Sequence, residues 1–169
     1  GKSDSISNDR LKINVLSRLG SFYYGKKDYD LSLKYYQQGL NLSKSVSDED
    51  YYNQLRFLLR SSDTFYRIKD TINAERYLVD AFQIAFISKK WENFDWVWGQ
   101  AWSAAYNPEL IAKLWNESYD HAKKSNSKEL LCFTTYKKSM LFNDWINPEH
   151  IKQRLKLFSD ALPIAEKLG

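Results

Sequence analysis

Residues 16–45 read LSRLGSFYYGKKDYDLSLKYYQQGLNLSKS, and residues 58–87 repeat the plan of this stretch 42 residues later. Such a repeat indicates two helices joined by a short turn, and neither copy can bury its apolar side alone. The copies must therefore stack on one another, which predicts an all-α array. Six positions are identical in the two copies: Leu16 and Leu58, Arg18 and Arg60, Tyr24 and Tyr66, Lys27 and Lys69, Asp28 and Asp70, and Tyr35 and Tyr77.

The first copy also carries a more specific motif. Leu19, Gly20 and Tyr23 have the Leu-Gly-x-x-Tyr spacing of a tetratricopeptide repeat. The small, aromatic and small positions of that family's second helix are then filled by Ser32, Tyr36 and Gly39 in the first copy, and the second copy holds Ala74, Leu78 and Ala81 there. The chain thus resembles the tetratricopeptide repeat family. The resemblance implies that Gly20 and Ala81 lie where two helices cross closely.

Two features depart from the family pattern. Ser61 and Ser62 replace the Leu-Gly pair in the second copy, and the period is near 42 residues instead of about 34. The longer period resembles the extended-helix variety found in kinesin light chains and bacterial peptide-responsive regulators. The resemblance implies an α-solenoid, a right-handed superhelix of about four antiparallel helix pairs. An unrelated array of helical hairpins is the alternative.

Length and composition agree with one helical domain. The 169 residues include only 6 Gly and 3 Pro, with 43% hydrophobic and 16% aromatic residues, so few breakers interrupt the chain. We expect a single domain over residues 9–169, after a disordered segment of residues 1–8. Its repeat units should span approximately 9–46, 47–88, 89–125 and 126–169.

The expected helices follow from caps, turns and apolar spacing. Asn107-Pro108-Glu109 recurs 40 residues later as Asn147-Pro148-Glu149, and both place a cap before a first-turn proline. Pro163 should kink or end the last helix near Leu162, because proline lacks a backbone donor. The remaining helices are expected at about 9–24, 29–45, 49–68, 73–88, 91–106 and 128–143.

The segment from residue 91 to 106 is the most aromatic. Trp91, Phe94, Trp98 and Trp102 recur at helical spacing and are expected in the core. Trp96 lies off that stripe and is the candidate for the border of a pocket, because tryptophan is seldom fully buried.

Charge and cysteine content exclude several classes. The net charge of +4 comes from 25 basic and 21 acidic residues without a basic block, which argues against nucleic acid. Cys132 is the single cysteine and forms no internal disulfide, and no apolar run is long enough for membrane insertion. The localisation is left open: the cytoplasm is favoured, and removal of a targeting segment is not excluded.

We find no pattern for catalysis. His121 and His150 lack the spacing that places metal ligands on one helical face, and Cys132 sits among apolar residues without a nearby base. No glycine-rich phosphate loop or nucleophile elbow is present. The sequence therefore predicts a protein that is not an enzyme and that has no cofactor.

Binding is better supported, since the first helices of stacked repeats line a concave wall. The resemblance to tetratricopeptide repeats implies wall positions at Asn14, Arg18, Ser21, Tyr24, Arg56, Arg60, Asp63, Tyr66 and Arg67, together with Ser17 and Leu59. Arg18 with Arg60, and Tyr24 with Tyr66, would form two ladders. Arginine forks onto carboxylates, so the partner would be another protein or peptide, with an acidic segment as one option.

Other interpretations of the wall stay open. The arginines could make only weak pairs within their helix, such as Arg56 or Arg60 with Asp63. Ser17 and Ser21 replace the lysine and asparagine clamp of the family's chaperone-tail binders, which disfavours that partner. The leading function is a non-enzymatic scaffold that binds a protein or peptide. The alternative is a regulatory module that binds a signal peptide and controls an attached output domain; RNA binding is disfavoured by the low charge.

Overall fold

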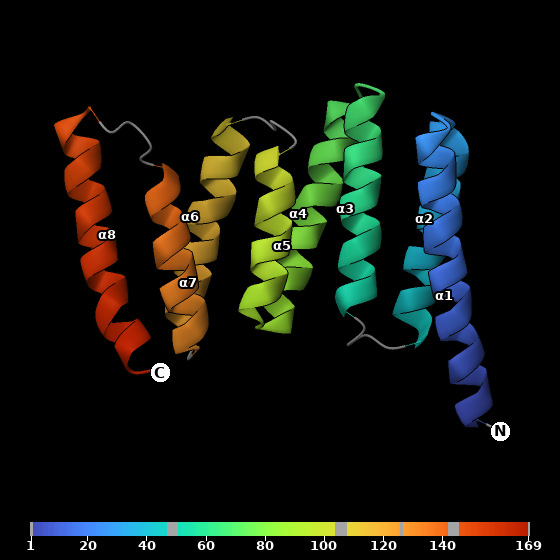
Figure 1. Cartoon of the computed structure of the whole chain (residues 1–169), viewed down its shortest axis with the longest axis horizontal. Coiled ribbons are helices and arrows are strands. Elements are labelled where there is room, and N and C mark those ends of the chain that lie inside the picture. Colours follow the sequence, from blue (N-terminus) through green and yellow to red (C-terminus); the bar gives the residue numbers. More distant parts are fainter. Residues whose placement is uncertain (1, 47–50, 104–107, 126, 142–145, 169) are drawn as a thin grey trace. The chain divides into compact units, whose positions relative to one another are not determined.

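The computed structural model describes residues 2–46, 51–103, 108–125, 127–141 and 146–168, with side chains from residue 8 onward and up to residue 101 in the second range. Every regular element in these ranges is helical, which confirms the all-α prediction (Figure 1). The elements are α1 (Lys2–Gly25), α2 (Tyr29–Val46), α3 (Tyr51–Arg67), α4 (Thr71–Ser88), α5 (Trp91–Ser103), α6 (Pro108–Lys124), α7 (Lys128–Lys138), the 3-10 turn η1 (Ser139–Leu141) and α8 (Pro148–Glu166).

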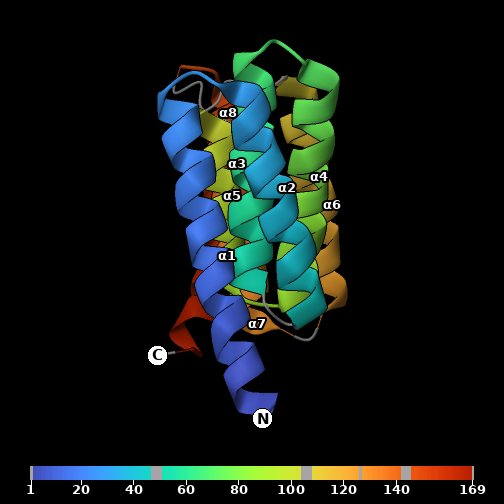
Figure 2. The same ribbon diagram turned by 90° about the vertical axis from the view of Figure 1, so that its right-hand side faces the viewer.

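The helices fall into two compact units. Unit 1 comprises residues 1–88 and 93–104, and unit 2 comprises residues 89–92 and 105–169. Within unit 1, α1 packs on α2 and α3 packs on α4, while α2 also contacts α3 (Figures 1 and 2). Within unit 2, α7 packs against both α6 and α8. The helices thus pack pairwise, as the repeat predicts; the single domain and the superhelix stay predictions.

In each repeat of unit 1, a serine side chain forms a hydrogen bond between the two helices where they cross. The Ser32 hydroxyl donates to the carbonyl oxygen of Gly20 at 2.9 Å, and the Ser62 hydroxyl donates to that of Ala74 at 2.6 Å. Gly20 and Ser62 are equivalent by the 42-residue shift, as are Ser32 and Ala74. The same crossing is therefore bridged in both copies, with the serine on opposite helices. A Cβ atom at Gly20 would overlap the Tyr36 ring, which confirms a close crossing there.

A second glycine, Gly39, lies where the first repeat packs against the second. The Phe57 ring of α3 lies where a Cβ atom at Gly39 of α2 would be, and it also contacts Tyr36 at 6.3 Å between ring centroids. Both aromatic side chains are buried. An interior this dense does not accommodate an added methyl group without movement. Gly39 therefore sets how closely α2 approaches α3.

The turns explain the identical Lys-Asp pairs. Lys27 and Lys69 both adopt the left-handed conformation, with φ of 62° and 63°. Their N–H groups donate to the carbonyl oxygens of Tyr24 and Tyr66, so each lysine satisfies an open carbonyl group at the end of the preceding helix. The next residue, Asp28 or Asp70, accepts a hydrogen bond from the backbone N–H three residues later, at 3.2 and 3.1 Å. Each aspartate therefore caps the following helix.

Asp70 gives a pH-dependent prediction. The Asn73 side chain donates to its carboxylate at 2.6 Å, and this bond, with that from the Asn73 backbone, lowers the pKa of Asp70. A lowered folded-state pKa stabilises the fold above the unfolded-state pKa, and this stabilisation disappears as the pH falls through the folded-state value. We expect the stability advantage of the unaltered chain over Asp70→Asn to shrink as the pH falls from about 5 to about 2.

The measurement is a series of urea melts at stepped pH, together with an NMR titration of the Asp70 carboxyl carbon. Asn73→Ala removes the side-chain donor and should raise the pKa of Asp70. A pKa of Asp70 that is unchanged in this variant would contradict the cap.

Most expected core residues are buried. In unit 1 the buried apolar set includes Tyr36, Leu40, Leu55, Leu58, Ala74, Tyr77, Leu78 and Ala81. In the aromatic segment Phe94 and Trp98 are buried as expected. Trp91 is wrongly predicted, because its side chain is 43% exposed and packs on Phe133 at 5.7 Å between centroids. The side chain of Trp102 lies outside those described.

Three boundaries differ from the prediction. Helix α1 begins at Lys2, whereas the sequence predicted an unordered segment up to Asn8. Helix α7 ends at Lys138 and tightens into η1, so the expected helix to residue 143 is too long within the described residues. Helix α8 continues to Glu166 past Pro163 instead of ending near Leu162. One missing donor on an exposed side does not end it, because the N–H groups of Lys167 and Leu168 still bond to Ile164 and Ala165.

Helix α8 begins as its motif predicts. The Asn147 side chain accepts hydrogen bonds from the N–H groups of Glu149 and His150, and Pro148 occupies the first turn. The equivalent cap predicted at Asn107 lies outside the described residues. None of the helices in the described ranges has the length and apolar character needed to cross a bilayer.

Candidate functional site

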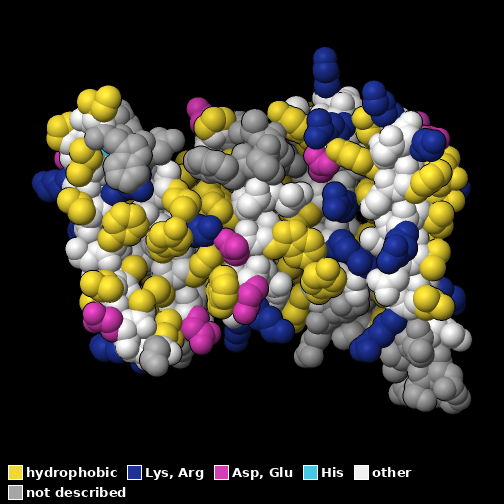
Figure 3. All heavy atoms as spheres, in the orientation of Figure 1, with side chains coloured by type: hydrophobic (Ala, Val, Ile, Leu, Met, Phe, Trp, Pro, Cys, Tyr) yellow, Lys and Arg dark blue, Asp and Glu magenta, His cyan; other side chains and the backbone are white. Residues whose placement is uncertain are grey.

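The predicted wall positions lie on α1 and α3, which are neighbours on one side of unit 1 (Figures 1 and 2). Seen from that side, basic side chains gather over both helices (Figure 3). Asn14, Arg18 and Ser21 on α1 and Arg60 and Arg67 on α3 are exposed; Tyr24, Arg56, Asp63 and Tyr66 are half-buried. We call the surface formed by these nine residues the arginine wall.

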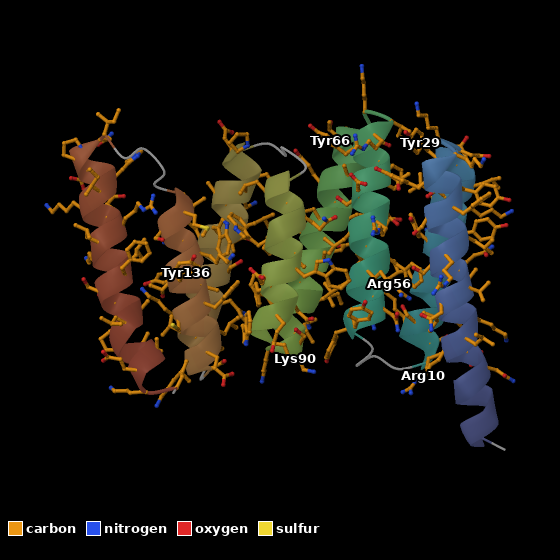
Figure 4. All side chains as sticks on the ribbon, viewed as in Figure 1. Arg10, Tyr29, Arg56, Tyr66, Lys90 and Tyr136 are labelled. Atoms are coloured by element: carbon orange, nitrogen blue, oxygen red, sulfur yellow. The ribbon has the colours of Figure 1, made fainter. Side chains whose placement is uncertain are left out.

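One contact across the arginine wall joins Asn14 to Arg56. The guanidinium group of Arg56 donates to the side-chain oxygen of Asn14 at 3.4 Å, and these positions are 42 residues apart. The same guanidinium lies 5.7 Å from the centre of the Tyr52 ring and 5.4 Å from that of Phe57. Aromatic rings on its flanks hold the cation in place. Figure 4 shows Arg56 on α3 beside α1.

A second contact joins the other end of the two helices. The Nε–H of Arg67 donates to the Tyr24 hydroxyl oxygen at 2.9 Å, and the same nitrogen lies 3.8 Å from the Asp63 carboxylate. Burial and a hydrogen bond to that carboxylate raise the pKa of Tyr24. The Tyr24 hydroxyl therefore accepts from Arg67 and donates to Asp63, and it stays protonated near neutral pH. Asp63 pairs with Arg67, whereas the sequence offered Arg56 or Arg60 as its partner.

Arg18 and Arg60 lie between these two contacts. Each is one helical turn beyond the Asn14–Arg56 pair, because Arg18 follows Asn14 by four residues and Arg60 follows Arg56 by four. Both side chains are exposed. Two guanidinium groups on equivalent faces of adjacent helices thus form the exposed centre of the arginine wall.

The remaining predicted positions serve other contacts. The hydroxyl of Ser21 lies 3.2 Å from that of Tyr36 on α2, at the edge of the arginine wall. Tyr66 and Arg67 line a shallow hollow with Lys69 and Thr71 at the α3–α4 turn. Leu59, which the resemblance placed on the wall, is buried in the core. The apolar side chain of Leu59 already favoured a place in the core over one on the exposed wall.

The contact between the Tyr52 and Trp96 rings was not predicted from the sequence. Their rings stack at 5.2 Å between centroids, with an angle of 29° between their planes. Tyr52 is largely exposed and Trp96 is half-buried. The stack extends the surface beside Arg56 onto the part of α5 in unit 1. The position of Trp96 off the buried stripe was the available signal, and nothing in the sequence indicated Tyr52.

The two histidines and the cysteine that the sequence analysis considered lie in unit 2. His121 is exposed and His150 is half-buried, and no described group of three histidine, cysteine or acidic side chains could hold a metal ion. Cys132 is half-buried with its sulfur 3.7 Å from the carbonyl oxygen of Ala161, and burial raises the pKa of its thiol. A raised pKa leaves the thiol protonated and weakly nucleophilic.

One of the comparisons with known proteins, that with a family model, agrees with the repeat. No curated protein matches the sequence. A solved structure described as "DHF46 filament" is similar at 19% sequence identity and a TM-score of 0.48, covering 96% of this chain and 99% of that chain. Residues 11–85 match the family model of the tetratricopeptide repeat, a family that generally provides protein-binding scaffolds and is usually not catalytic. All nine residues of the arginine wall lie within this matched segment, which is similar to a tetratricopeptide repeat.

Proposed function

We propose that the arginine wall binds an acidic segment of another protein, so that the chain acts as a non-enzymatic scaffold. The observation that carries this proposal is the exposed pair Arg18 and Arg60, which lies between the Asn14–Arg56 contact and the Tyr24–Arg67 contact. Those two contacts tie α1 to α3. The pair is therefore presented on a fixed surface and not on a mobile loop.

The charges of the arginine wall support an acidic partner. It carries four arginines and one aspartate, and Asp63 is already engaged by Arg67 and Tyr24. A guanidinium group donates two parallel hydrogen bonds to a carboxylate, and an exposed arginine keeps this capacity for a partner. Such an interface attracts carboxylate-bearing segments and weakens as salt is added.

The aromatic neighbours support a peptide. Tyr52 and Trp96 form a flat apolar surface next to Arg56, and Tyr66 lies at the other end of α3 (Figure 4). Rigid rings bury large areas with few rotors to immobilise, which is why they are enriched in binding surfaces. An extended segment with acidic side chains and one aromatic or aliphatic anchor fits this combination.

The test selects peptides from a random library displayed on phage and measures their affinity by fluorescence anisotropy. We expect selected sequences enriched in Asp and Glu. Arg18→Ala with Arg60→Ala should weaken a selected peptide at least tenfold, because a hydrogen bond to a charged group contributes about 1.5–3 kcal/mol. The melting temperature should stay nearly unchanged, since exposed substitutions alter stability by about 0.5 kcal/mol or less.

The matched control is Lys34→Ala with Arg76→Ala, which removes two exposed positive charges from α2 and α4. It has the same net charge as the test variant but leaves the arginine wall intact, so its affinity should match that of the unaltered chain. Equal weakening in both variants would mean that only overall charge matters. Unchanged affinity in the test variant would assign Arg18 and Arg60 to solvated surface.

A further inference from the structure

A shallow hollow of about 470 Å³ lies at the α3–α4 turn, at the end of α3 that carries Tyr66 (Figure 4). Its lining consists of Tyr66, Arg67, Lys69 and Thr71, and we call these four residues the turn hollow. Each of the four side chains carries a hydrogen-bond donor, two of them are cationic, and none of the four is acidic. Such a lining favours an anion that accepts hydrogen bonds from several directions.

The acidic residue of the turn is already engaged. Asp70 lies between Lys69 and Thr71 in the sequence and is not part of the lining. Its carboxylate accepts a hydrogen bond from the side chain of Asn73 at 2.6 Å and another from the Asn73 backbone at 3.1 Å. Asp70 therefore serves as the cap of α4, while the residues on either side of it line the turn hollow.

Arg67 is held in position through one of its nitrogens. Its Nε–H donates to the Tyr24 hydroxyl oxygen at 2.9 Å, and the same nitrogen lies 3.8 Å from the Asp63 carboxylate. The terminal nitrogens of the guanidinium group carry its remaining N–H groups. These are the donors that a bound anion would use, and the contacts of Nε orient them before the anion arrives.

The first repeat shows what distinguishes the turn hollow. A hollow of about 450 Å³ at the α1–α2 turn includes Lys27 and Tyr29, which correspond to Lys69 and Thr71 by the 42-residue shift. Gly25 stands at the position of Arg67, so no guanidinium group is present there. The lining of this first hollow balances two lysines with two aspartates: it consists of Lys26, Lys27, Asp28, Tyr29, Asp30 and Ile68. The excess of positive charge is therefore a property of the turn hollow.

We propose that the turn hollow binds the phosphate group of a phosphorylated residue in the partner's acidic segment. A phosphomonoester offers three acceptor oxygens and nearly two negative charges near neutral pH, more than a carboxylate offers. Arg67 can donate to two phosphate oxygens side by side, and Lys69 supplies the second cation. The hydroxyl groups of Tyr66 and Thr71 add further donors. The inference rests on the proposed function, because the arginine wall holds the rest of the segment.

The turn hollow is continuous with the arginine wall, which places the phosphate relative to the acidic side chains. Tyr66 and Arg67 belong to both surfaces. Arg60 precedes Arg67 by seven residues, which corresponds to about 10 Å along a helix. For a segment that runs along α3 in an extended conformation, at about 3.3 Å per residue, the phosphorylated residue lies about three positions from the acidic residue that contacts Arg60.

The first arm of the experiment titrates the isotope-labelled chain with phosphoserine whose amino and carboxyl groups are blocked, and follows the amide signals by NMR. The Thr71 amide should shift, and blocked glutamate should shift it much less. Lys69→Gln should abolish this shift. The matched control is Lys27→Gln, which should retain it. Both lysines are exposed and left-handed, with φ of 63° for Lys69 and 62° for Lys27, so the two changes have the same backbone cost.

The second arm moves a phosphoserine along an acidic peptide selected on the arginine wall. The affinity should rise about tenfold when phosphoserine lies about three positions from the acidic residue that depends on Arg60. Lys69→Gln should remove this gain and leave the affinity of the unphosphorylated peptide nearly unchanged, whereas Lys27→Gln should keep the gain. Inorganic phosphate should displace the phosphopeptide only at much higher concentration, because it makes no contact with the arginine wall.

The two claims fail separately. Unchanged affinity of the unphosphorylated peptide in Arg18→Ala with Arg60→Ala contradicts the proposed function. The phosphate site is contradicted if the Thr71 amide does not shift, or if blocked glutamate shifts it equally. It is also contradicted if the gain from phosphate persists in Lys69→Gln or is lost in Lys27→Gln. Displacement of the phosphopeptide by an equal concentration of inorganic phosphate would assign the turn hollow to the free ion and would overturn the proposal.

Discussion

Phe57→Ala is expected to lower the free energy of unfolding of unit 1 by about 3–5 kcal/mol, as truncation of a fully buried phenylalanine does. The Phe57 ring has no exposed area and fills the boundary between the repeats, against Gly39 and Tyr36. Removing it leaves a cavity between α2 and α3 that the helix backbones cannot close without shifting. The measurement is urea unfolding followed by circular dichroism.

Gly39→Ala provides a matched test of the same contact. In the unaltered chain the added methyl group would meet the Phe57 ring and cost about 1–3 kcal/mol. In the Phe57→Ala background that ring is gone, so the same change should cost much less, and a double-mutant cycle should show strong coupling. Additive effects, or a cost below about 1 kcal/mol for Phe57→Ala, would contradict the α2–α3 packing.

Trp115→Ala is expected to have an effect of similar size, about 3–5 kcal/mol, in unit 2. Trp115 lies on α6, is fully buried, and is the largest of the fully buried side chains described. In a repeat array each segment is stabilised mainly by its neighbours, so the loss should appear first in α6 to α8. Hydrogen exchange should show reduced protection of those amides, with smaller changes in α1 to α4.

Trp91→Ala is the control for Trp115, because Trp91 also belongs to unit 2 but is partly exposed. It should cost clearly less. Equal loss of protection along the whole chain in Trp115→Ala would contradict a local effect and would support the single domain that the sequence predicts.

The helix order could be predicted because the breakers are few and well placed. The Lys-Asp turns mark the ends of α1 and α3, and the left-handed Lys27 and Lys69 show why both copies keep the same two residues. The end of α7 was missed because the tightening into η1 has no proline or glycine signal. The effect of Pro163 on the length of α8 was overestimated, since a proline on the exposed side of a helix removes only one hydrogen bond.

The candidate site was only partly predictable. The repeat register was sufficient to place Asn14 opposite Arg56 and Tyr24 near Arg67, because equivalent positions of stacked helices lie side by side. It did not indicate which side chains would pair. Asp63 pairs with Arg67 because both side chains meet at the Tyr24 hydroxyl. The position of that hydroxyl is set by the packing between α1 and α3.

The stacking of the two repeats in this register underlies the arginine wall. The most direct measurement is a NOESY spectrum of the isotope-labelled chain. The account predicts cross-peaks between the Tyr24 ring and the Arg67 side chain, and between the side chains of Asn14 and Arg56. Assigned spectra of a folded chain with neither set of cross-peaks, or with Tyr24 in contact with a different turn of α3, would contradict it.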